Sequence, residues 1–131
     1  MTLSSVAFEK TGLTLRGREF LIEKKGGRYS IAKTEAVQPF EEFSARDFGR
    51  PGRDDLNGML PPKLAMILIN LARTPLNSIL LDPFCGSGTI LSEALLLGYK
   101  NLIGSDISEK AIENTKKNLD FSMRLLEELG I

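Results

Sequence analysis

The stretch that decides the fold is Asp82-Pro83-Phe84-Cys85-Gly86-Ser87-Gly88-Thr89. The apolar run before it, residues 78–82, is typical of a buried strand in a parallel sheet, and the apolar residues after it, 89–97, indicate a helix that ends at Gly98. Glycines let a ligand approach the backbone, and a helix N-terminus favours a negative group. The stretch therefore predicts a strand, a ligand-binding loop and a helix.

A second predicted strand, residues 101–106, ends in Asp106, twenty residues after Gly86. That separation is typical of the acid that reaches ribose hydroxyls in a βαβ unit. A helix N-cap or a solvated strand end is the alternative role for this acid. If a nucleotide is bound there, we expect Ile107 to flank its base. Ser108 is the predicted N-cap of the helix that follows.

Two better-known glycine loops do not match this sequence. Leu91 stands where the dinucleotide fingerprint Gly-x-Gly-x-x-Gly has its third glycine. A phosphate-binding P-loop needs Gly-Lys-Ser/Thr, which does not follow here. The loop is therefore predicted to hold a nucleotide-like ligand of another kind.

The residues before this βαβ pattern predict three further elements. Residues 19–23 and 28–32 flank Gly26-Gly27 and predict a β-hairpin. A short helix and an irregular loop are expected over residues 38–57. Pro61 and Pro62 then precede a helix over residues 63–72 that is apolar nearly all round, which predicts packing on more than one side.

Composition excludes several kinds of function. The chain has 131 residues, 17 basic and 17 acidic, with no His and one Cys. It therefore has neither an intramolecular disulfide nor a Cys/His zinc cluster, and we expect no metal site. Residues 1–5 lack a signal-peptide pattern, and no apolar stretch approaches the roughly 20 residues of a membrane span. We expect a cytoplasmic protein without a membrane partner.

The glycine loop resembles motif I of the S-adenosylmethionine-dependent amino-methyltransferases. The wider segments Arg46–Pro51, Gly58–Ala65 and Ile90–Ala94 resemble the THUMP-associated RNA methyltransferases that methylate guanine N2 in tRNA. The resemblance covers residues 36–131. It implies an α/β, Rossmann-like S-adenosylmethionine-dependent methyltransferase fold in residues 46–131, preceded by a β-rich extension or linker in residues 1–45, and RNA, above all tRNA, as the partner.

The resemblance also implies which residues bind S-adenosylmethionine. They belong to the loop, to the end of the second strand and to the segment before the apolar helix: Asp82, Pro83, Phe84, Cys85, Gly86, Ser87, Gly88, Thr89, Asp106, Ile107, Leu60 and Pro61. Within this set, Phe84 is expected to pack in the core or loop rather than to stack on a base. Cys85 is not expected to act as a nucleophile, because no His or other base lies near it in the sequence. Glu93, one turn into the helix, is expected at the surface or bracing the loop.

Three cations on one irregular loop, Arg46, Arg50 and Arg53, suit contacts with RNA phosphates. Internal pairing with Asp47, Asp54 and Asp55 is the alternative. Both possibilities remain open at the level of sequence.

No catalytic residue is predicted in this chain. The resembled family orients the target amine with an Asn/Asp-Pro-Pro-Tyr/Phe loop, which this sequence lacks. Two strands of the family's seven-stranded sheet are recognisable, so we expect a fold that is incomplete at its C-terminal side. An uncovered sheet predicts a homo-oligomer or a second chain that completes it. The alternatives are a non-catalytic fragment or binding module and a DNA amino-methyltransferase.

Overall fold

The computed structural model describes residues 7, 10–13, 19–54 and 58–130. The chain divides into two compact units, residues 1–42 and 43–131. The boundary lies inside the helix α3 (Phe40–Phe48), three residues before the boundary expected from the sequence.

The first unit contains the predicted β-hairpin. Strands β1 (Phe20–Lys25) and β2 (Arg28–Lys33) pair antiparallel, with Lys25 opposite Arg28. Gly26 and Gly27 form the turn with φ of 57° and 79°, angles that glycine adopts without a steric penalty and that suit the twist of a hairpin. The prediction of a hairpin at this place is confirmed.

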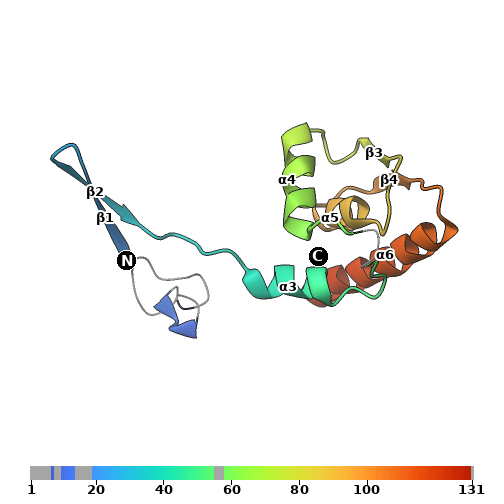
Figure 1. The fold of residues 1–131 in the computed structure, drawn as a ribbon, viewed down its shortest axis with the longest axis horizontal. Helices are drawn as coiled ribbons and strands as arrows, with labels where there is room; N and C mark the ends of the chain where they lie inside the picture. Colours follow the sequence, from blue (N-terminus) through green and yellow to red (C-terminus); the bar gives the residue numbers. More distant parts are fainter. Residues whose placement is uncertain (1–6, 8–9, 14–18, 55–57, 131) are drawn as a thin grey trace. The chain divides into compact units, whose positions relative to one another are not determined.

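The second unit is built around a parallel βαβ arrangement. It contains α4 (Pro62–Ala72), β3 (Ile79–Asp82), α5 (Thr89–Leu96), β4 (Asn101–Gly104) and α6 (Glu109–Leu129). Strands β3 and β4 pair in parallel, so their carboxyl ends lie at the same edge of the sheet. Helix α5 contacts both strands and lies between α4 and α6 (Figure 1). This order of strands and helices agrees with the sequence prediction.

The apolar core of this unit lies where α4, α5 and the sheet meet. Ile69, Ala94 and Tyr99 are buried at its centre, and four partly buried side chains pack around them: Leu80, Ile90, Leu97 and Leu102. Gly104 permits close packing of β4 on α5, because a Cβ there would lie 2.5 Å from Leu91 Cδ1. The core therefore fixes the two strand ends relative to α5.

The sheet is covered on one face only among the described residues. Ile79, Leu81 and Ile103, which alternate with the core residues, are between 50% and 68% exposed. The expectation that β3 is a buried parallel strand was therefore wrong for this face. Parallel sheets are normally covered on both faces, so this exposed apolar face is unusual for a parallel sheet.

Candidate functional site

The candidate site lies at the carboxyl ends of β3 and β4. After Asp82 the chain turns through residues 83–88 and enters α5 at Thr89. Gly86 and Gly88 take positive φ values of 53° and 79°. The amide of Cys85 donates to Ser105 O at 2.9 Å, and the amide of Ser105 donates to Asp82 O at 3.0 Å. The loop after β3 and the loop after β4 are thus joined to each other through their backbones.

Asp106 strengthens this junction through its side chain. Oδ2 accepts a hydrogen bond from the Gly86 amide, and Oδ1 accepts one from the Ser108 amide, both at 2.9 Å. The bonds from Ser108 and Gly86 are the main reason why the pKa of Asp106 is lowered. A carboxylate is therefore present at neutral pH, and it retains accepting capacity beyond these two bonds.

Two open hollows lie beside this carboxylate. The first, about 240 Å³, is lined by the glycine loop and by a second segment, with these residues: Gly58, Met59, Leu60, Asp82, Phe84, Cys85, Gly86, Ser87, Thr89 and Ile90. The second, about 330 Å³, is lined by Asp106, Ile107, Glu109, Ile112, Glu113 and Lys116. Asp106 lines the second hollow, and it accepts a hydrogen bond from Gly86, which lines the first. The two hollows are therefore close enough for one extended ligand to reach into both.

The two glycines of the loop have different surroundings. A Cβ at Gly86, which lines the first hollow, would meet no atom within 4 Å. A Cβ at Gly88 would lie 2.7 Å from Thr115 Cγ2 on α6. Gly86 therefore leaves room for a ligand, whereas Gly88 allows the loop to pack against the protein.

Helix α6 supports the loop through buried polar side chains. Thr115 Oγ1 donates to Gly86 O at 2.9 Å, and Asn118 Nδ2 donates to Ser87 O at 2.8 Å. The Cys85 thiol is buried and lies 3.6 Å from Thr115 Oγ1. Ser108 caps the beginning of α6 by accepting from the Ala111 amide at 3.3 Å, as its sequence predicted.

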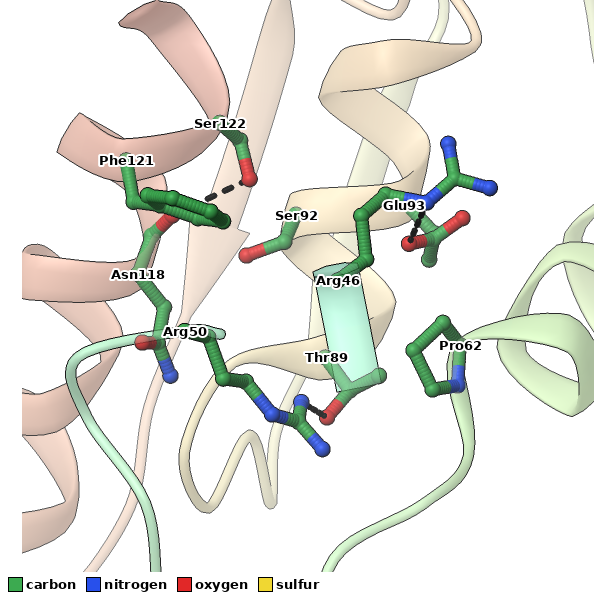
Figure 2. Close-up of a pocket in the computed structure, with 9 residues that line it drawn as sticks. All are labelled: Arg46, Arg50, Pro62, Thr89, Ser92, Glu93, Asn118, Phe121 and Ser122. Carbon is green, nitrogen blue, oxygen red and sulfur yellow. Dashed lines mark hydrogen bonds and ion pairs between the residues drawn. The ribbon is translucent and has the colours of Figure 1, made fainter. Parts of the chain in front are cut away.

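Two of the three arginines expected to face RNA point into the protein. Arg50 is 6% exposed, donates from Nη1 to Thr89 Oγ1 at 2.6 Å and lies 3.6 Å from Asp47. Arg46 Nε lies 3.4 Å from Glu93 Oε1 (Figure 2). The alternative of pairing with a neighbouring aspartate is confirmed at Arg50, whereas the partner of Arg46 is Glu93, which the sequence did not predict. Arg53 is exposed, and Asp55 lies outside the described residues.

Glu93 is buried on α5, with 2% of its surface exposed. Burial raises the pKa of Glu93, and the charges of Arg46 and Arg50 oppose that rise. The expectation of a surface acid was wrong. The ion pair of Glu93 joins α5 to Arg46 of α3, and a role in bracing the glycine loop stays a prediction.

The remaining predicted site residues lie at several depths. Phe84 is 86% exposed, so the expectation that it packs in the core or loop was wrong. Ile107 is fully exposed, and Pro83 and Pro61 are exposed. Ser87 and Thr89 are buried, and Leu60 is half-buried in the wall of the first hollow.

Sequence reasoning missed the polar inner face of α6. Asn114, Asn118 and Ser122 are buried together with Ala111 and Thr115. The spacing of four residues between these small polar side chains places them on one helix face and was the available signal.

Two negative findings concern the described residues. No group of three or more His, Cys, Asp or Glu side chains is arranged there to hold a metal ion. In the same part of the chain, no helix is both long enough and apolar enough to span a membrane.

A parallel βαβ unit with a glycine loop and an acid at adjacent strand ends is typical of the α/β class of domains that bind nucleotide cofactors. Comparison with known families identifies the particular member of this class. The sequence model of UPF0020, described as an RMKL-like methyltransferase domain, matches residues 50–123. The chain belongs to this family of methyltransferase domains.

Curated relatives carry a more specific name. The tRNA (guanine(10)-N2)-dimethyltransferase of Methanothermobacter thermautotrophicus is 39% identical over 93 residues, which are 70% of this chain and 27% of the relative. The protein of the same name from Methanocaldococcus jannaschii is 49% identical over 84 residues, 60% of this chain and 24% of the relative. A probable enzyme of this name from Methanothermococcus thermolithotrophicus is 51% identical over 57 residues, 44% and 35% of the two chains. The chain thus spans about a quarter to a third of the length of these relatives.

Proposed function

We propose that this chain is the donor-binding half of a Rossmann-like, S-adenosylmethionine-dependent RNA methyltransferase that acts on guanine N2 in tRNA. One observation carries the proposal: the Asp106 carboxylate at the end of β4 is bonded to Gly86 in the glycine loop at the end of β3. This junction is where open α/β sheets bind nucleotide-like ligands. The methyltransferase family and the names of the relatives support the reaction and the substrate.

The residues at this junction fit the chemical groups of the proposed donor. Gly86 leaves space in the first hollow, where the side chains of Asp82 and Leu60 also lie. Asp106 keeps acceptor capacity suited to ribose hydroxyls, and the exposed Ile107 offers an apolar surface to a base. When bound, S-adenosylmethionine supplies an electrophilic methyl group on a sulfonium. The role of the chain is to bind and orient that donor.

Orientation of the target amine is proposed to come from other polypeptide. The sequence has no Asn/Asp-Pro-Pro-Tyr/Phe motif to hold a nucleobase amine. Methyl transfer is an in-line displacement, and much of its acceleration depends on holding the two reacting groups in alignment. We therefore expect this chain by itself to bind donor while transferring methyl groups very slowly.

Calorimetric titration of the chain with S-adenosylmethionine tests the donor site. We expect saturable binding, and at least a tenfold loss of affinity in Asp106→Ala, because the variant lacks both the loop contact and the acceptor. Lys100→Ala, an exposed substitution after α5, is the matched control and should bind like the wild type. No heat at millimolar donor, or unchanged binding by Asp106→Ala, would contradict the proposal.

Substrate choice needs a separate assay. Native assemblies that contain this chain should transfer labelled methyl groups to tRNA and not to duplex DNA. Labelling of duplex DNA alone would favour the alternative of a DNA amino-methyltransferase.

We also propose that the outer face of the β3–β4 sheet is covered by further polypeptide, in the simplest case a second copy of the chain. The exposed Ile79, Leu81 and Ile103 support this partner surface. Light scattering should give a mass above that of the monomer at micromolar concentration, and Leu81→Lys should lower it. A wild-type monomer that unfolds cooperatively would contradict this part of the proposal.

A further inference from the structure

The first hollow has two walls that come from separate segments of the second unit. One wall is the glycine loop, residues 82–90, and the other contains Gly58, Met59 and Leu60. Residues 50–54, which we call the strap, contact this second wall directly, because the backbone amide of Asp54 donates a hydrogen bond to Met59 Sδ at 3.2 Å. Whatever fixes the strap to the loop therefore also limits how the two walls move.

Asn118 joins the strap to the loop with a single amide group. Its Oδ1 accepts from the Gly52 amide at 2.8 Å, and its Nδ2 donates to Gly52 O at 2.9 Å and to Ser87 O at 2.8 Å. The side chain is 2% exposed. These three bonds use both protons of the amide nitrogen and need its oxygen as an acceptor, so no other side chain of this size reproduces them.

Arg50 makes a second connection between the same two segments. Its guanidinium donates to Thr89 Oγ1 at 2.6 Å, at the point where the loop enters α5 (Figure 2). Gly52 allows the strap to pack closely on α6, since a Cβ at this position would lie 2.5 Å from Asn114 O. The strap is thus held against α6 and the loop by two buried side chains from different elements.

We propose that Asn118 and Arg50 are positioning residues that set the separation of the two walls and so preorganise the donor hollow. This inference rests on the proposed function, because it assigns the hollow to S-adenosylmethionine. Neither residue lines the first hollow, so each acts through the backbone it holds. Removing a group that holds a binding loop in place commonly weakens ligand binding, because the mobile site must then be ordered when the ligand binds.

The competing explanation is that the two residues contribute only to stability. Ser122 provides a matched control for that explanation, because its buried Oγ donates to Asn118 O at 3.0 Å within α6 and forms no bond with the strap or the loop. Ser122→Ala therefore removes a buried hydrogen bond one turn away while leaving the connection between the walls intact.

The experiment compares wild type, Asn118→Ala, Asn118→Asp and Ser122→Ala at a temperature where circular dichroism shows each to be folded. Asn118→Asp replaces a donor by an acceptor that faces two carbonyl oxygens, so it should have the larger effect. We expect S-adenosylmethionine to bind at least tenfold more weakly to both Asn118 variants and within twofold of wild type to Ser122→Ala. Exchange of the Gly52 amide proton should accelerate at least tenfold in the Asn118 variants only.

Folded Asn118 variants with wild-type affinity and wild-type Gly52 exchange would overturn the inference. A loss of donor affinity in Ser122→Ala equal to that in the Asn118 variants, measured at matched stability, would also overturn the inference. If the Asn118 variants do not fold, Arg50→Lys is used instead, because it keeps the charge and most of the stem while losing the guanidinium bond to Thr89; the same tenfold weakening is expected. Absence of donor binding by the wild type would refute the proposed function, and Gly52 exchange would still decide whether Asn118 holds the strap.

Discussion

Replacing Gly88 by alanine tests whether the glycine loop is packed against α6 as described. The φ of 79° places an L-residue in the left-handed region, which costs roughly 1–2 kcal/mol. The new Cβ would also lie 2.7 Å from Thr115 Cγ2 and 2.9 Å from its Oγ1, and overpacking of this kind costs roughly 1–3 kcal/mol. We therefore expect the free energy of unfolding to fall by about 2–5 kcal/mol.

Gly86→Ala is the matched control, two residues away in the same loop. Its φ of 53° carries a similar conformational cost, while its Cβ would meet no atom within 4 Å. This variant should lose about 1–2 kcal/mol, so the difference between the two variants isolates the crowding against Thr115. Urea unfolding followed by far-ultraviolet circular dichroism measures both values, since the chain has no tryptophan.

Equal losses in the two variants would refute the packing of the loop on α6. Thr115→Ala provides a further check, because it removes both of the nearest side-chain atoms. Although it also loses the bond to Gly86 O, it should reduce the additional cost of Gly88→Ala in a double-mutant cycle. Donor affinity should follow the opposite order, since a methyl group at Gly86 enters the proposed donor hollow.

Three further outcomes follow from the structure. Arg46→Ala should lose roughly 3–5 kcal/mol of stability near neutral pH, because it leaves the buried Glu93 without its ion pair. The pKa of Glu93 is raised, so this loss of stability, measured by urea unfolding, should shrink as the pH falls and the carboxyl takes up a proton. Because the pKa of Asp106 is lowered, the hydrogen bonds to its ionised carboxylate hold the loop at pH values above the ordinary pKa of aspartate, and they are lost as the pH falls through the lowered pKa. Calorimetry should therefore show that donor affinity falls in acid for the wild type and changes less with pH for Asp106→Asn. Gly52→Ala should cost roughly 1–3 kcal/mol through contact with Asn114, measured by thermal unfolding; a wild-type midpoint would contradict the packing of the strap.

The sequence alone was sufficient for the elements of the fold and for their order. The ends of elements are marked by the Gly26-Gly27 turn, by Pro61 and Pro62 at the start of α4 and by the Ser108 cap. These signals act within a few residues, so they can be recognised in the local sequence. The spacing from Gly86 to Asp106 likewise predicted an acid at the end of the second strand of a βαβ unit, but the hydrogen bond between the two residues is seen only in the folded structure.

Only the tertiary structure decided which polar side chains support the site. Arg50 and Thr89 are 39 residues apart, and Asn118 and Gly52 are 66 apart, so no local pattern relates them. A cation on an irregular loop is predicted from the sequence to be exposed to solvent. Its burial is tolerated only where the folded chain brings a hydrogen-bonding or charged partner to it. Phe84 shows the converse, because this aromatic side chain is 86% exposed although its hydrophobicity predicts burial. Local interactions depend on residues that are neighbours in the sequence, so the sequence predicts them. Burial depends on distant segments that meet only in the folded chain.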